Sequence, residues 1–179
     1  MIFIHIPKTA GTSIQKALGP TSIGHKKITE AKGDSFLTCV RNPYDRAVSI
    51  YWFLRKIKRK LPFNITKTYK SVDEFWLDIF DVGISDARML LHQQIDFLRE
   101  DTTKGGISPR IKTVLRYETL ADNWPAFAAK HNLPALEYKN KSHQRPAIPW
   151  QEELSDESIA IIGELYADDF EYLNYERIS

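Results

Sequence analysis

The chain opens with Ile2-Phe3-Ile4-His5-Ile6-Pro7-Lys8-Thr9-Ala10-Gly11-Thr12-Ser13, and this stretch decides the fold. The apolar, β-branched residues before Pro7 predict a short buried strand, which the proline ends. A small turn rich in hydrogen-bond donors follows. Ile14, Ala17 and Leu18 then recur at helical spacing and predict a helix over residues 12–18, which Gly19-Pro20 closes.

A strand, a tight turn and a helix N-terminus in this order predict a binding site for an anion. The first N–H groups of a helix have no partner within it, and the helix dipole makes this end positive. Lys8 adds a full positive charge. The turn differs from a Walker A loop, in which the lysine follows the last glycine and directly precedes a serine or threonine. The alternative interpretation is an ordinary strand–turn–helix with a solvated lysine.

The composition is that of a soluble globular protein. The 179 residues are 42% hydrophobic and 27% charged, so we expect one domain spanning residues 1–179. The formal net charge of +2 gives no general attraction to nucleic acid or to a membrane surface. The single cysteine, Cys39, excludes internal disulfides and lies in an apolar stretch, which predicts a buried thiol.

The sequence also carries expectations about location. No apolar run is long enough to span a bilayer. The first motif begins too close to Met1 for a signal peptide to precede it, so we expect a cytoplasmic protein.

The remaining pattern alternates strands with helices. Such alternation predicts an α/β fold with a central parallel sheet and helices on both faces. Ligands of such sheets bind beyond the carboxyl ends of the strands, so the turn after Pro7, Arg41 and Glu118 are expected along one edge. The predicted strands cover residues 36–40 and 113–117, with a fourth strand guessed between 21 and 28; the predicted helices cover residues 43–60, 72–80, 87–98, 121–131 and 155–167, with a short aromatic tail after them.

A second motif follows the strand over residues 36–40. It reads Arg41-Asn42-Pro43-Tyr44-Asp45-Arg46-Ala47-Val48-Ser49. Arg41, at the strand end, can present a planar fork of donors to a phosphate, and Ser49 lies two turns into the following helix. The alternative is a local ion pair between Arg41 and Asp45, with Ser49 as a small packing residue.

Together the two motifs resemble those of enzymes that use 3′-phosphoadenosine 5′-phosphosulfate (PAPS). The order Pro-Lys-Thr-x-Gly-Thr-Ser resembles the 5′-phosphosulfate loop of sulfotransferases. The order Arg-Asn-Pro-Tyr-Asp-Arg-x-Val-Ser resembles the 3′-phosphate motif of the carbohydrate sulfotransferase family that includes heparan sulfate 2-O-sulfotransferase and bacterial relatives. Residues 114–120, 140–143 and 165–170 are similar to later segments of that family. The spacing between Lys8 and Thr38 is shorter than in the animal enzymes, which affects the expected acceptor more than the cofactor.

The resemblance implies a single P-loop-like domain of three layers that transfers a sulfuryl group from PAPS to an acceptor hydroxyl, without a metal. A carbohydrate is the implied acceptor. Lys8 would stabilise the charge on the leaving oxygen, and Arg41 with Ser49 would bind the 3′-phosphate. The residues implied to bind the cofactor are Lys8, Thr9, Ala10, Gly11, Thr12, Ser13, Arg41, Ser49, Lys141, Ser142 and Arg145.

An acceptor hydroxyl needs a base, and His25 is the first candidate among the five histidines. It lies in a polar segment shortly after the first helix, where the resembling enzymes carry a catalytic histidine, and an imidazole titrates near neutral pH. The alternative for His25 is a surface histidine beside two lysines. Glu118, at a strand end, is the alternative base, and His5 is expected to be a core residue.

Two other functions remain open at the level of sequence. The first is a P-loop kinase-like phosphotransferase that uses ATP and Mg²⁺, although the position of Lys8 argues against it. The second is a non-catalytic protein that binds a nucleotide or a sulfated glycan. The sequence identifies neither the acceptor nor the oligomeric state.

Overall fold

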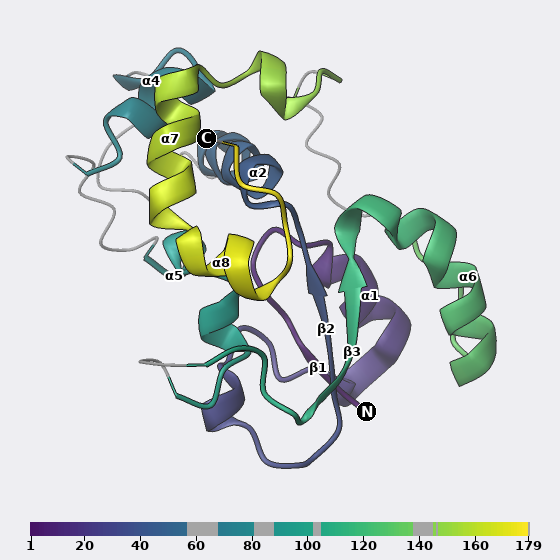
Figure 1. Ribbon diagram of the computed structural model, residues 1–179. Coiled ribbons are helices and arrows are strands. Elements are labelled where there is room, and N and C mark those ends of the chain that lie inside the picture. Colours follow the sequence, from purple (N-terminus) through teal and green to yellow (C-terminus); the bar gives the residue numbers. More distant parts are fainter. Residues whose placement is uncertain (57–67, 81–87, 102–104, 138–144, 146, 179) are drawn as a thin grey trace. The chain divides into compact units, whose positions relative to one another are not determined.

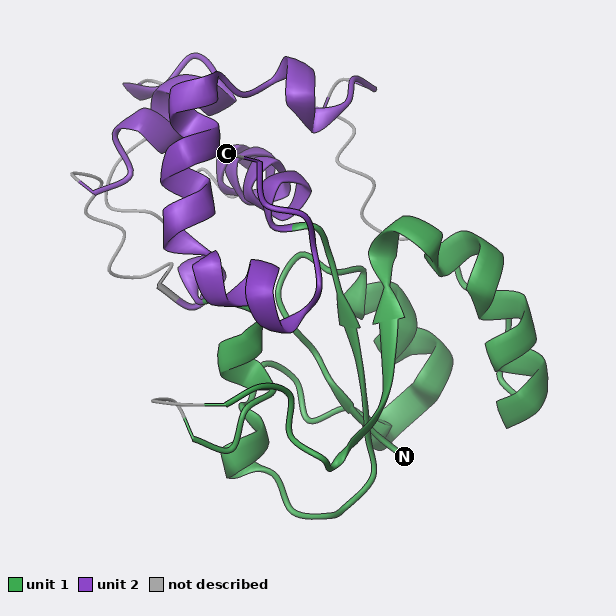
Figure 2. Ribbon diagram, viewed as in Figure 1, with its two compact units in different colours: residues 1–42, 93–141 green, residues 43–92, 142–179 purple. Residues whose placement is uncertain are grey.

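The computed structural model divides into two compact units, which are described separately (Figure 2). Unit 1 comprises residues 1–42 and 93–141, and unit 2 comprises residues 43–92 and 142–179. Each unit is built from two separate parts of the chain. The residues that the structure describes are 1–56, 68–80, 88–101, 105–137, 145 and 147–178 (Figure 1).

Unit 1 contains a three-stranded parallel sheet in the order β1-β2-β3 (Figure 1). The strands are β1 (Ile2–Ile4), β2 (Phe36–Val40) and β3 (Ile111–Arg116). All five residues of the central strand β2 are buried, which explains its continuous apolar character. The parallel α/β character predicted from the alternating pattern is therefore confirmed.

One face of this sheet is covered by α1 (Gly11–Leu18) and α6 (Leu120–His131). Leu37 and Cys39, which alternate with the other residues of β2, pack there against Ile14 and Trp124. Burial of each such large apolar side chain stabilises the fold by about 1.5–3 kcal/mol. The thiol of Cys39 is buried as expected. Short 3₁₀ turns complete the unit: η1 (Gly19–Thr21), η2 (Ile28–Glu30), η4 (Ile95–Phe97) and η5 (Tyr117–Thr119).

The segment after α1 pairs with the outer edge of β1, although it does not form the full strand guessed between residues 21 and 28. A single parallel bridge joins Ser22 to Phe3. Two backbone hydrogen bonds extend it, from Ile23 N–H to the Phe3 oxygen at 3.1 Å and from His5 N–H to the Gly24 oxygen at 3.0 Å. Gly24 then takes a left-handed conformation with φ 67°, which ends the pairing.

The regular secondary structure in the described residues of unit 2 is helical. Its core is aromatic, with Tyr44, Tyr51, Phe75, Trp76 and Tyr166 all buried. Edge-on and tilted ring contacts, such as that of Phe75 with Trp76 at 5.3 Å, fill this core. Its elements are α2 (Pro43–Lys56), α4 (Val72–Leu77), α5 (Arg88–Leu91), η6 (Trp150–Glu152), α7 (Asp156–Leu165) and α8 (Ala167–Tyr172).

Two predicted helices differ from the observed ones. The helix expected over residues 87–98 is wrong beyond Leu91, where α5 ends, because Gln94 turns inward and is fully buried with its amide bonded to Arg41. The aromatic tail expected after residue 167 is instead helix α8. The end of the helix predicted over 43–60 lies outside the described residues.

Candidate functional site

The turn after β1 is held in an unusual backbone conformation. Lys8 and Ala10 have φ angles of 70° and 65°, in the left-handed region that non-glycine residues rarely adopt. Each such residue costs energy, and residues of this kind concentrate at functional sites. The hydroxyl of Thr9, which is fully buried, donates to the Ile6 oxygen at 2.9 Å and braces the turn from within. The Thr9 side chain therefore shapes the turn.

Helix α1 begins directly behind this turn. Its N-cap is Ala10, which has no side-chain oxygen to accept from the first amides of the helix. The N–H groups of Ser13 and Ile14 bond back to the Ala10 carbonyl at 3.0 and 3.2 Å. Thr12 is exposed and Ser13 is buried. The turn and the first turn of α1 thus bring Lys8, an exposed hydroxyl and the positive end of a helix together, as the sequence predicts.

Gly11 is at the centre of this arrangement. A Cβ at position 11 would meet Cδ2 of the His5 ring at 1.8 Å and Nε2 at 2.1 Å. Both distances are far below any van der Waals contact, so only glycine fits there while His5 keeps its place. The His5 ring therefore requires glycine at position 11 for steric reasons, which the sequence alone did not reveal.

His25 lies against the same histidine. The centroids of the His5 and His25 rings are 4.1 Å apart, and Nδ1 of His25 is 2.7 Å from the His5 carbonyl oxygen. Because a carbonyl oxygen only accepts, Nδ1 carries the hydrogen, and Nε2 of the neutral ring holds the lone pair. The bridge between Ser22 and Phe3 is what brings His25 beside the end of β1.

His5 itself is half-buried and remains uncharged at neutral pH. Burial and, to a smaller extent, the nearby His25 lower its pKa from 6.5 to about 4, whereas a hydrogen bond with Gln15 opposes this shift. A neutral ring is compatible with the positive helix end that it faces. The prediction that His5 is a core residue therefore holds only in part, because its ring also lies next to His25 and Gly11.

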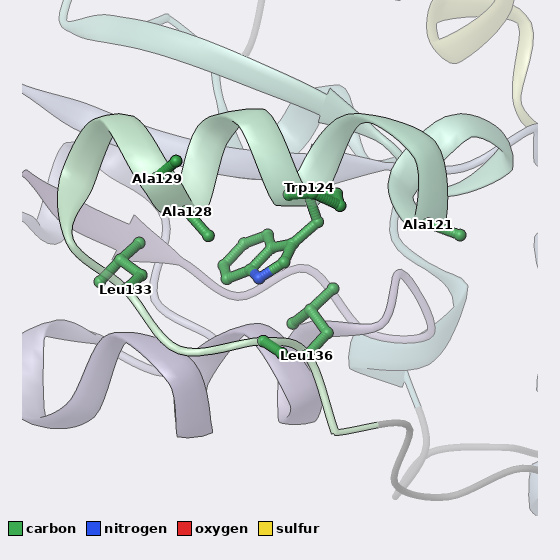
Figure 3. A pocket seen from close by; sticks show the side chains of 8 residues that line it. Ala121, Trp124, Ala128, Ala129, Leu133 and Leu136 are labelled. Atoms are coloured by element: carbon green, nitrogen blue, oxygen red, sulfur yellow. The ribbon is translucent and has the colours of Figure 1, made fainter.

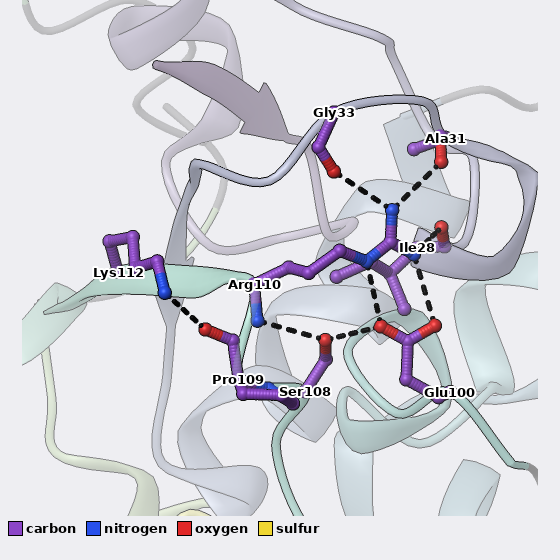
Figure 4. Close-up of polar contacts among 8 residues, drawn as sticks. All are labelled: Ile28, Ala31, Gly33, Glu100, Ser108, Pro109, Arg110 and Lys112. Carbon is purple, nitrogen blue, oxygen red and sulfur yellow. Dashed lines mark hydrogen bonds and ion pairs between the residues drawn. The ribbon is translucent and has the colours of Figure 1, made fainter.

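The segment after His25 is fastened to the rest of unit 1 by Arg110 (Figure 4). Nη1 of Arg110 donates to the Ala31 and Gly33 oxygens, both at 3.0 Å, and Nη2 donates to the Ile28 oxygen at 2.8 Å. The carboxylate of Glu100 accepts from Nε at 2.8 Å and from Nη2 at 3.0 Å. Three of the five guanidinium hydrogens therefore hold this segment, and the other two bind Glu100.

Arg41 lies beside the turn, at the carboxyl edge of the sheet, as predicted. Its Nη1 donates to the Lys8 oxygen at 3.1 Å, and its guanidinium carbon is 3.9 Å from the centre of the Tyr117 ring. Its backbone N–H and C=O are bonded to the side-chain amide of Gln94 at 2.9 and 2.7 Å. Arg41 is only 5% exposed. Its hydrogen bond to the Lys8 oxygen braces the strained turn directly.

Sequence reasoning missed Gln94 and Tyr117, which hold Arg41. Tyr117 lies in the segment 114–120 but carried no predicted role, and Gln94 lies in a stretch whose pattern predicts a helix. Glu118, the alternative base, accepts from the Asn42 N–H at 2.6 Å and thus joins the ends of β3 and β2. This contact confirms that the three strand ends share one edge.

The other predicted cofactor residues belong to unit 2 or lie outside the described residues. Ser49 is half-buried on α2. Arg145 pairs with Asp45 at 2.8 Å and with Glu153 at 3.3 Å, and its side chain is 17% exposed. These two ion pairs fix the Arg145 side chain within unit 2, and its predicted contact with a phosphate stays a prediction. Lys141 and Ser142 lie outside the described residues.

An apolar groove of about 460 Å³ lies elsewhere in unit 1, along α6 (Figure 3). Trp124 projects from α6 toward Leu136, and its Nε1 donates to the Pro134 oxygen at 3.0 Å. The groove has none of the charged groups of the anion site and takes no part in it. Its lining consists of Ala121, Trp124, Pro125, Ala128, Ala129, Leu133, Ala135 and Leu136.

Two searches of the described residues gave negative results. They contain no group of three or more histidine, cysteine, aspartate or glutamate side chains placed to hold a metal ion. No helix within them is sufficiently long and apolar to cross a membrane.

The chain was compared with protein-family models, with curated proteins and with solved structures, and none of them matches it. The resemblance to carbohydrate sulfotransferases therefore stays a prediction from the sequence motifs.

Proposed function

We propose that this protein transfers a sulfuryl group from PAPS to an acceptor hydroxyl, with a carbohydrate as the acceptor class. The observation that supports this function best is the position of His25 next to the anion-binding turn, with the lone pair of Nε2 available. Transfer of a group from a phosphate to a hydroxyl needs a cradle for the anion and a base for the hydroxyl proton. We choose PAPS as the donor because the order of residues in the two motifs resembles that of sulfotransferases.

In this proposal the turn stabilises the leaving group. As the S–O bond to the 5′-phosphate breaks, negative charge grows on the bridging oxygen. We assign the stabilisation of that charge to the ammonium of Lys8 and the amides at the start of α1. We assign the binding of the other phosphosulfate oxygens to the hydroxyls of Thr12 and Ser13. Preorganised donors of this kind need no rearrangement during the reaction, which is the advantage that a strained, braced turn offers.

His25 removes the proton of the acceptor hydroxyl. Its Nδ1 hydrogen bond to the His5 carbonyl orients the ring and leaves Nε2 as the acceptor of that proton. We assign the base to His25 before Glu118, because one carboxylate oxygen of Glu118 is already engaged with the Asn42 N–H.

Recognition of the 3′-phosphate is assigned to Arg41 and Ser49, with Lys141 and Ser142 added from the motif. Arg41 acts through its charge and through its hold on the Lys8 carbonyl. Arg145, which also pairs with Asp45 and Glu153, is assigned to the cofactor as well. A P-loop-like architecture of three layers, and chemistry that requires no metal, belong to the same proposal.

Calorimetry with two nucleotides tests the donor. We expect 3′,5′-adenosine bisphosphate to bind at least tenfold more tightly than ADP with Mg²⁺. The Lys8→Ala variant should lose at least tenfold in affinity, whereas Lys16→Ala, which removes an exposed lysine of α1, should bind as the wild type does. Tighter binding of ADP with Mg²⁺ would favour the kinase-like function instead.

A second experiment separates an enzyme from a non-catalytic binder. With labelled PAPS and a panel of carbohydrate acceptors, we expect transfer by the wild type and none by His25→Ala, while His25→Ala still binds the bisphosphate. Equal turnover in the variant would move the role of base to Glu118. Nucleotide binding without transfer to any acceptor would favour the binder.

A further inference from the structure

His5 contacts both the segment that carries His25 and the start of α1. Its N–H donates to the Gly24 oxygen at 3.0 Å, which anchors the segment that carries His25. Its carbonyl oxygen accepts from Nδ1 of His25 at 2.7 Å. Its ring fills the space where a side chain at Gly11 would lie.

The ring of His5 acts as a spacer of fixed thickness. One side of it faces Gly11 at the start of α1, and the His25 ring is tilted against it at 45° with the centroids 4.1 Å apart. The Phe3 ring stacks on it at 5.8 Å and 25°, which restrains its plane. A movement of the His5 ring therefore has to displace either the helix start or His25.

We propose that His5 is a positioning residue: its ring and carbonyl set the place and the tautomer of His25 relative to the anion-binding turn. The proposal rests on the proposed role of His25 as the base. It adds a residue that no motif assigns and explains why the motif needs glycine at position 11. His5 does not contact the reacting atoms in this scheme; it acts through His25.

The chemistry of an imidazole suits this spacer. The flat ring fits next to Gly11 and against the His25 ring, and it also makes a hydrogen bond with Gln15. A protonated ring would bring a third positive charge to a place that already holds Lys8 and a helix N-terminus. The ring therefore positions its neighbours without competing for the anion.

The test uses ¹⁵N NMR of the His25 ring at a pH where it is neutral, because the shifts of the two nitrogens report which one carries the hydrogen. In the wild type we expect well-separated shifts with Nδ1 protonated. In His5→Ala the stacking surface is lost, and we expect the two shifts to converge as both tautomers become populated. His5→Phe keeps a flat ring and should keep the wild-type pattern.

A variant on the other side of the spacer gives an independent readout. In Gly11→Ala the new methyl group pushes the His5 ring away, so we expect a changed His25 pattern and at least a tenfold loss of bisphosphate affinity. The double variant Gly11→Ala/His5→Ala removes the clash. It should recover nucleotide affinity and still show both His25 tautomers, a separation that mere loss of folding does not produce.

The outcomes decide the proposal. Unchanged His25 shifts in His5→Ala, or a Gly11→Ala variant that binds nucleotide and keeps the wild-type shifts, would overturn it. The NMR readout needs no nucleotide, so it stands even if the protein binds no PAPS. Absent nucleotide binding with the expected shifts would reject the proposed function and retain the positioning role.

Discussion

Two helices of this protein begin in opposite ways. At the start of α7, the Ser155 hydroxyl accepts from the Ser158 N–H at 3.2 Å. Asp73 of α4 then accepts from the Ser155 N–H at 2.8 Å and from the Ser155 and Ser158 hydroxyls at 2.7 and 2.6 Å. At the start of α1, the N-cap is Ala10, whose side chain can accept nothing.

The difference shows how a helix end is either closed or kept available. The start of α7 already holds a carboxylate from its own chain, so an external anion would find its place taken. The start of α1 instead lies behind a strained turn that presents Lys8, and both features cost stability unless an anion is bound. We therefore associate the closed end with folding and the open end with ligand binding.

The largest expected effect is a dependence of stability on pH, caused by His5 next to the start of α1. The His5 pKa is lowered from 6.5 to about 4, so between these pH values the unfolded chain binds more protons than the folded one. Stability must therefore fall as the pH drops from 6.5 to 4, by at most about 3 kcal/mol at about 1.4 kcal/mol per unit. Urea unfolding at several pH values measures this. In His5→Ala the slope in that window should largely disappear; a slope equal to that of the wild type would contradict the assignment.

The closed end should respond to the loss of its carboxylate. Burial raises the pKa of Asp73, but hydrogen bonds from Ser158 and Ser155 outweigh it, and the net pKa is lowered. This stabilisation is present above pH 3.8 and is lost as the pH falls through the lowered value. At pH 7 we expect Asp73→Ala to reduce the free energy of unfolding by about 2 kcal/mol, since three hydrogen bonds to a charged group disappear.

A control for that variant is Glu164→Ala, which removes an exposed carboxylate from α7, the helix whose start Asp73 closes. It should change stability by less than about 0.5 kcal/mol. Neither variant should alter nucleotide affinity. A loss of affinity in Asp73→Ala alone would show that the closed end also serves the ligand, and the contrast between the two ends would fail.

A single carboxylate can also close the open end. Thr12 is exposed in the first turn of α1, so Thr12→Asp places a negative charge where we expect the donor's own charge. We expect about a tenfold loss of bisphosphate affinity by calorimetry and a gain in stability of about 0.5 kcal/mol from the helix dipole. Thr12→Asn has nearly the same shape without the charge and should lose much less affinity. Equal losses in the two variants would assign the effect to the missing hydroxyl.

Local patterns in the sequence predicted most of unit 1. The strand over residues 36–40 has the expected bounds. The parallel order of the strands places Arg41 and Glu118 at the edge of the sheet where the turn after β1 lies. These features depend on periodicity and on the chirality of the chain, both of which can be read within short windows.

The contacts that complete the site depend on distant residues instead. Gln94 binds the backbone of Arg41 across 53 positions of sequence. No periodicity indicates that a side-chain amide will make these backbone hydrogen bonds. The pairing of Arg145 with Asp45 spans 100 positions, and no local pattern in the sequence indicates it. Such contacts are decided by packing, so their residues look unremarkable in the sequence.

The smallest expected effect comes from the strain at the open end. Ala10 has a φ of 65°, which costs a residue with a Cβ roughly 1–2 kcal/mol and costs glycine little. Glycine loses more entropy on folding, so we expect Ala10→Gly to gain only about 0.5 kcal/mol in urea unfolding. The same change inside the helix, Ala17→Gly, should lose about 1 kcal/mol. If Ala10→Gly also binds the bisphosphate a few-fold more weakly, the strain at Ala10 holds the turn ready for its anion; unchanged affinity would mean that the strain is a by-product of the turn.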